Sequence, residues 1–230
     1  MADKLEVTPI LVRQGQAQED ASTFILSFQG RGSHGDVRFH VLAETPAADP
    51  EPLCQRLLAT FQRSVAGQGR VSLTTAMGNA LQESHRELMA TNREASLATQ
   101  VGAGMTCLAL RDSDIYIARG GPGALYLRDA HGVRTINPLS TDAAAGGEAQ
   151  GSQGRAMLGL ADGAVPVMLE RQTLEPEQVL LAAYSSLIKS VSYDGLVTIL
   201  SSSPGEAADK LRLLMQEGPV FAALLVTPAR

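Results

Sequence analysis

The chain has 230 residues, of which 44% are hydrophobic and only 4% aromatic. This length suits one large domain, and its core must be mostly aliphatic. Lys and Arg number 19 against 24 Asp and Glu, so the formal net charge is −5. That balance indicates no basic surface and argues against a nucleic-acid partner.

The two cysteines, Cys54 and Cys107, are far apart in the sequence and lack CxxC spacing. We therefore interpret them as reduced interior thiols rather than zinc ligands. The N-terminal stretch MADKLEVTPILVRQG lacks the apolar core of a signal peptide. No uninterrupted apolar run approaches the ~20 residues that span a bilayer. The sequence predicts a cytoplasmic protein without a membrane span.

Apolar and β-branched runs predict three strands near the N-terminus, over residues 5–12, 23–28 and 37–43. Asp49-Pro50-Glu51 is then typical of a helix start, with Asp49 as N-cap and Pro50 at the first helical position. A longer helix is predicted over residues 74–96. Its apolar face is marked by residues at helical spacing, namely Met77, Leu81, Ser84 and Leu88.

The second half of the chain returns to strands. Short runs separated by Asp, Gly and His turns predict an antiparallel meander over residues 106–110, 115–118, 124–127 and 133–136. The Ala-, Gly- and Gln-rich stretch 139–154 predicts a mobile surface loop. Further strands are predicted over 165–169, 179–183 and 220–227. Between the last two, Ser203-Pro204-Gly205-Glu206 is typical of a capping box that starts a helix.

Strands cluster and helices pair in this order, without the strict alternation of a parallel α/β sheet. The pattern predicts a single α+β domain over residues 1–230, with helices packed on antiparallel sheets.

The same order of elements is found in the protein phosphatase 2C family, and local motifs match it. Val12-Arg13 followed by Glu19-Asp20 resembles the family's "VR…ED" opening, and Gly102–Thr106 resembles its "GMGTT" strand. Residues 117–128 are similar to "VANVGDSRAYLIR", and residues 139–142 to "LTxDH". Residues 179–192 are similar to "LLLASDGLWDVVS", and residues 218–226 to "DNITVVVV".

This resemblance implies a four-layer αββα sandwich, in which two antiparallel sheets are flanked by helix pairs. It also implies hydrolysis of phosphoserine and phosphothreonine by two Mg²⁺ or Mn²⁺ ions. Two divalent ions close together require several carboxylate ligands to offset their charge.

Most of those carboxylates are missing from this chain. The family's central aspartate falls at Ala43, or at Glu44 after a shift of one residue. The "SDG" pair is replaced by Ser185-Ser186, and the final "DN" pair by Val220-Phe221. Asp20 is retained, with Glu19 before it. We therefore treat Asp20, Glu19 and Glu44 as vestigial metal ligands, although for Asp20 the favoured interpretation is a solvated or hydrogen-bonded turn carboxylate. Arg13 is the candidate phosphate-binding arginine.

Other chemistry is weakly indicated. The four histidines lack metal-ligand spacing and are interpreted as surface or turn residues: His34, His40, His85 and His131. Ser185-Ser186 lacks a nucleophile-elbow context. The glycine-rich stretches 102–104 and 120–123 lack a Walker lysine and are interpreted as turns.

Three functions follow as hypotheses. The first is a catalytically inactive domain that binds a protein partner as a regulatory or scaffolding module. It needs no cofactor, and loss of the metal charge favours a protein interface over phosphopeptide binding. The second is a weakly active phosphatase with a reduced Mg²⁺ or Mn²⁺ site on Glu19, Asp20 and Glu44. The third is a structural subunit of a larger complex.

Overall fold

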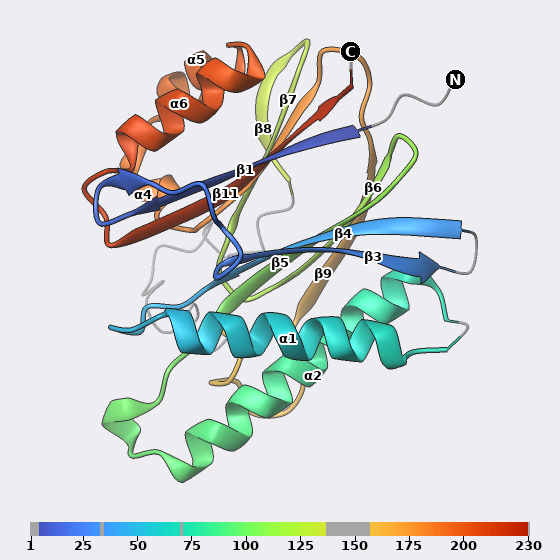
Figure 1. The fold of residues 1–230 in the computed structure, drawn as a ribbon, viewed down its shortest axis with the longest axis vertical. Coiled ribbons are helices and arrows are strands. Elements are labelled where there is room, and N and C mark those ends of the chain that lie inside the picture. The colour runs from blue at the N-terminus through green and yellow to red at the C-terminus, as the bar shows by residue number, and fades with distance from the viewer. Residues whose placement is uncertain (1–4, 33–34, 70, 137–156, 230) are drawn as a thin grey trace, which may run out of the picture.

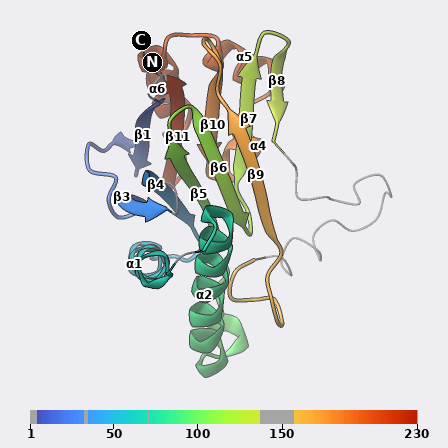
Figure 2. The same ribbon diagram turned by 90° about the vertical axis from the view of Figure 1, so that its right-hand side faces the viewer.

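A computed structural model describes residues 5–32, 35–69, 71–136 and 157–229 of the chain. Two antiparallel sheets pack face to face, and each is covered on its outer side by helices (Figures 1 and 2). This αββα sandwich confirms the fold class predicted from the sequence. The predicted loop 139–154 lies outside the described residues.

One sheet has six strands in the order β2-β1-β11-β10-β7-β8. The first and last strands of the chain are neighbours along their full length, with Leu5 opposite Pro228 and Arg13 opposite Val220. The strands are β1 (Leu5–Arg13), β2 (Gln16–Ala17), β7 (Ala124–Asp129), β8 (Gly132–Thr135), β10 (Val179–Ala183) and β11 (Val220–Pro228).

The other sheet has five strands in the order β3-β4-β5-β6-β9. Its register places Glu44, the last residue of β4, opposite Gly104, the first residue of β5. The strands are β3 (Ile25–Gly32), β4 (Gly35–Glu44), β5 (Gly104–Arg111), β6 (Asp114–Gly120) and β9 (Val167–Thr173). The strand predicted over 165–169 therefore begins two residues later and runs further.

Helices α1 (Glu51–Gly67) and α2 (Leu73–Glu94) cover the five-stranded sheet, and the short helix η1 (Leu97–Thr99) follows them (Figure 1). The apolar stripe of α2 is buried as predicted, with Met77 and Leu81 fully covered. The predicted cap of α1 is wrong. Pro50 rather than Asp49 holds the N-cap position, and no side chain caps the helix.

Helices α4 (Leu187–Ser190), α5 (Tyr193–Leu200) and α6 (Pro204–Leu214) lie on the side of the six-stranded sheet. The capping box of α6 is confirmed, because Glu206 N donates to Ser203 Oγ and Ser203 N donates to the Glu206 carboxylate. The sequence did not predict α4 or α5. Helix α5 contains Gly195 and several β-branched residues, which have low helix propensity.

The two sheets share one hydrophobic core. Fully buried aliphatic side chains from both sheets fill it, including Leu108, Ile117, Leu125, Leu181 and Leu224. Both cysteines are free and buried, as expected. No helix within the described part of the chain is long and apolar enough to cross a membrane.

Candidate functional site

A pocket of about 720 Å³ opens at one end of the sandwich, where β4 and β10 end and β11 begins. Glu44 enters it from the five-stranded sheet. Ser185, Ser186 and Lys189 enter it from the segment after β10, and Val220 from the start of β11. Segments distant in sequence therefore meet here.

Glu44 lies at the base of this pocket and is 9% exposed. Its Oε2 accepts two hydrogen bonds from Ser185, at 2.8 Å from the backbone N and 3.2 Å from Oγ. Burial disfavours the charged carboxylate and raises its pKa to about 7, although the Ser185 hydrogen bonds and the charge of Arg119 act in the opposite direction. Glu44 can therefore gain or lose a proton near neutral pH.

Ala43 and Phe221 do not line the pocket, although the motif alignment places both at substituted metal-site positions. Both are fully buried. The Phe221 ring packs edge-on against Tyr184, with centroids 6.4 Å apart, and Tyr184 Oη donates to the Ala43 carbonyl at 2.6 Å. These residues therefore join the two sheets beneath the pocket. Of the substituted cleft positions, Ser185, Ser186 and Val220 line it.

The glycine-rich stretch 120–123 packs against the start of β5 and helps to close the base of the pocket. A Cβ on Gly104 would lie only 2.3 Å from the Pro122 carbonyl oxygen, and one on Gly121 only 2.5 Å from the Ala103 carbonyl oxygen. Gly121 also has a φ of +78°, which favours glycine. The interpretation of this stretch as a turn therefore agrees with the structure.

Asp20 and Glu19 are exposed and do not line the pocket. Asp20 accepts a hydrogen bond from the Ser22 backbone N at 2.8 Å, and its hydrogen bonds to Ser22 lower the pKa of its carboxyl. This is a local turn interaction. The three proposed vestigial ligands are therefore not gathered in one site.

The donor set does not fit a binuclear metal centre. Within the described ranges no group of three or more His, Cys, Asp and Glu side chains could hold a metal ion. Among the described residues, the carboxylates that line the pocket are Glu44, which is bound to Ser185, and the exposed Glu217. Two divalent ions would require more negative ligands than this.

Arg13, the candidate phosphate-binding residue, forms an ion pair with Glu51 at the start of α1. It lies at the end of β1 opposite Val220, at the edge of the pocket, but does not line it. A phosphate group would have to compete with Glu51 for this guanidinium.

Sequence reasoning missed the charged residues Lys189 and Glu217, as well as the apolar rim formed by Leu214 and Met215. Lys189 is in the unpredicted helix α4, and Glu217 follows α6 in a turn. In the sequence, Lys189 and Glu217 are marked by their position close to the substituted motifs at 185–186 and 220–221.

Solved structures with the same fold include serine/threonine phosphatases. A Streptococcus agalactiae serine/threonine phosphatase is 13% identical with a TM-score of 0.70, covering 98% of this chain and 100% of its own. PppA, described as a key regulatory component of T6SS in Pseudomonas aeruginosa, is 14% identical with a TM-score of 0.69 and 99% coverage of both chains. The catalytic domain of PstP, solved with 2 manganese ions, is 15% identical with a TM-score of 0.66 and 96% coverage of both chains.

These similarities show that the chain has the protein phosphatase 2C fold, as its motifs predict. No protein-family model matches the sequence, and the search of curated proteins found no match. The likeness at such low identity concerns the fold alone.

Proposed function

We propose that the protein is a catalytically inactive domain of the phosphatase 2C fold that binds a protein partner through the pocket at Glu44. The observation that carries the proposal is the pocket itself. The pocket lies at one end of the sandwich. In the part of the chain that the structure describes, its lining offers one buried and one exposed carboxylate and no metal-binding cluster.

The pocket wall suits contact with a polypeptide. Prolines 46, 50, 122 and 219 line it together with Leu214 and Val220, so much of its surface is apolar. Hydroxyl groups of Ser185, Ser186 and Ser190 add hydrogen-bonding groups beside them. Apolar surface with a few convergent polar groups is typical of a binding site.

The reduced-metal alternative is not favoured, because Asp20 and Glu19 lie outside the pocket lining. We expect purified protein to show no Mn²⁺-dependent turnover of a phosphopeptide. Asp20→Ala should leave the background rate unchanged. Turnover that requires Mn²⁺ and disappears in Asp20→Ala would overturn the inactive assignment.

Partner binding is tested by affinity capture from the native host with matched variants. Leu214→Arg introduces a charge at the pocket rim, where Leu214 is 46% exposed. Leu97→Arg is the control, because Leu97 is 88% exposed in η1 and does not line the pocket. We expect one partner to be retained by the wild type and by Leu97→Arg and lost from Leu214→Arg. Equal retention by all three proteins would exclude the pocket as the contact.

A further inference from the structure

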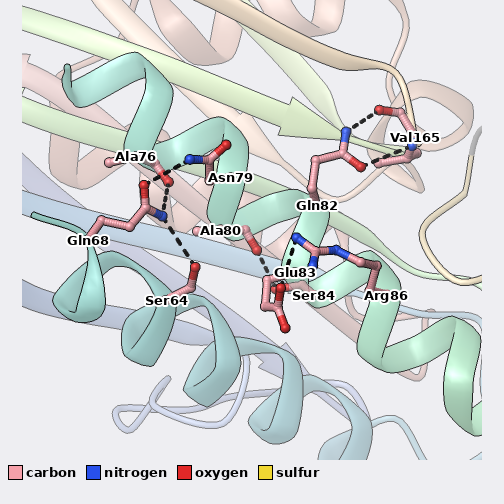
Figure 3. A network of polar contacts seen from close by, with 10 residues as sticks. All are labelled: Ser64, Gln68, Ala76, Asn79, Ala80, Gln82, Glu83, Ser84, Arg86 and Val165. Atoms are coloured by element: carbon pink, nitrogen blue, oxygen red, sulfur yellow. Dashed lines mark hydrogen bonds and ion pairs between the residues drawn. The ribbon is translucent and has the colours of Figure 1, made fainter. Parts of the chain in front are cut away.

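Three side chains of α2 hold the chain where it returns to the five-stranded sheet, in residues 157–165. Gln82 binds both backbone groups of Val165, donating to its O at 2.6 Å and accepting from its N at 3.2 Å (Figure 3). Asn92 donates to Gly159 O at 3.0 Å and to Val101 O at 2.8 Å. His85 lies between these residues on the helix and contacts the same segment.

His85 is fully buried, not on the surface as the sequence interpretation had it. The Gly159 backbone N donates to its Nδ1 at 2.9 Å, so Nδ1 must carry a lone pair. The ring proton is therefore on Nε2, which lies 2.8 Å from Gly163 O and can donate to it. In this neutral tautomer both ring nitrogens are satisfied.

A second proton on His85 is incompatible with this arrangement. It would go to Nδ1 and place an N–H donor directly against the N–H of Gly159. Because the site is buried, neither donor could turn to water, and an unsatisfied buried donor is costly. Acid therefore disfavours the arrangement in which the Gly159 backbone N donates to His85 Nδ1.

The segment held by His85 forms part of the pocket wall. Leu158 pairs with Ala103 through two backbone hydrogen bonds, of 3.1 and 2.9 Å, and the preceding residue, Met157, lines the pocket. The fit is tight. A Cβ on Gly102 would lie 2.5 Å from Met157 Sδ, and one on Gly159, which has a φ of +85°, would lie 2.3 Å from Leu88 Cγ.

We propose that His85 is an acid-sensitive latch for the pocket wall. Neutral His85 holds residues 157–163 against α2 and thereby fixes Met157 beside the pocket. Protonation of Nδ1 breaks the bond to Gly159 and releases this segment. The latch follows from the contacts of His85 alone, whereas its effect on partner binding rests on the proposed function.

The charged groups around α2 are engaged elsewhere. Tyr116 and Arg171 lie on the face of the five-stranded sheet that α2 covers, and Arg171 is paired with Asp114 and stacked on Tyr116. Arg63 of α1 forms an ion pair with Glu87 of α2. In the held segment the carboxylate is Asp162, which is exposed. Among the described residues, none of these groups is hydrogen-bonded to or ion-paired with His85.

The test is amide hydrogen exchange of the whole protein, without any partner. We expect the protection factor of Gly159, corrected for the intrinsic exchange rate, to fall about tenfold or more between about pH 8 and about pH 5. The Met157 methyl resonance should shift over the same pH range. His85→Gln keeps a donor and an acceptor but does not titrate, so its protection should not depend on pH.

His131→Gln is the matched control, because His131 is exposed. It should keep the pH dependence of the wild type. Equal protection of Gly159 at both pH values in the wild type, or a pH dependence that persists in His85→Gln, would overturn the latch. If His85→Gln does not fold, the ring ¹⁵N shifts of the wild type decide. A proton on Nδ1 rather than Nε2 at neutral pH would contradict the proposal.

These outcomes are independent of the capture experiment. The latch can fail while a partner still binds at Leu214. Conversely, the pocket can prove unused while Gly159 still loses protection in acid.

Discussion

The Glu44 carboxyl is buried at the base of the pocket, so its proton equilibrium is coupled to folding. Folding raises its pKa from the ordinary value of 4.5 to about 7. Between these pH values the folded protein holds a proton that the unfolded chain has released, so the free energy of unfolding falls as pH rises. The predicted loss across this window is on the order of 3 kcal/mol, with no further change at higher pH.

Glu44→Gln removes this titration. The difference between the free energies of unfolding of the wild type and the variant, followed over pH, is therefore the contribution of Glu44 alone. We expect the difference to grow from about pH 4.5 to about pH 7, as measured by urea unfolding. Glu217→Gln changes an exposed carboxylate of the same pocket and should follow the wild-type curve. Parallel curves for Glu44→Gln and the wild type would contradict the burial argument.

The sequence alone left two alignments open at residues 43 and 44, and only the strand register decides between them. Motif alignment put the family's central aspartate at Ala43 or Glu44. A shift of one residue reverses the face on which a strand side chain lies. The structure buries Ala43 beneath the pocket and points Glu44 into it. His85 was misplaced for a related reason, because the sequence does not show that residues 159 and 163 return to α2.

The contact between the 120–123 turn and the start of β5 leaves no room for a side chain at Gly104. In Gly104→Ala the new methyl group meets the Pro122 carbonyl, a backbone atom that cannot move aside cheaply. We expect a loss of about 1–3 kcal/mol in the free energy of unfolding, measured by urea titration.

Gly205→Ala is the comparison, because a Cβ at Gly205 in α6 would meet no atom within 4 Å. It should stabilise the protein by about 0.5–1 kcal/mol, since alanine has less backbone freedom to lose. Equal effects of the two substitutions would show that the 104–122 contact is not tight.

Elements that are marked by residues close together in the sequence were predictable from the sequence. The capping box of α6 needs only Ser203 and Glu206, and the stripe of α2 needs only helical spacing. Helix α5 was missed because Gly195 and its β-branched neighbours have low helix propensity, and its helical form depends on packing against α6 and β8. The beginning of α1 was misjudged because Asp49 and Pro50 are both plausible first residues.

The two sheets share one core, so the molecule should unfold as a single unit. Phe221, Tyr184 and Ala43 link β11, the end of β10 and β4 across the interface. Phe221→Ala should lower the free energy of unfolding by about 3–5 kcal/mol while calorimetry still shows one transition. Leu97→Ala, at an exposed site, should have almost no effect. Two transitions in Phe221→Ala would mean that the sheets unfold separately.

The pairing of β1 with β11 also determines how the molecule can be tethered. Arg13 and Val220 lie at the pocket end of this pair, and Leu5 and Pro228 lie together at its other end. Eight residue steps along a strand separate the two ends by roughly 26 Å. Leu5 and Pro228 therefore lie away from the pocket mouth. Because Leu5 and Pro228 are opposite each other, a short linker between these two residues could join β1 to β11 in a circularly permuted chain, at a distance from the pocket.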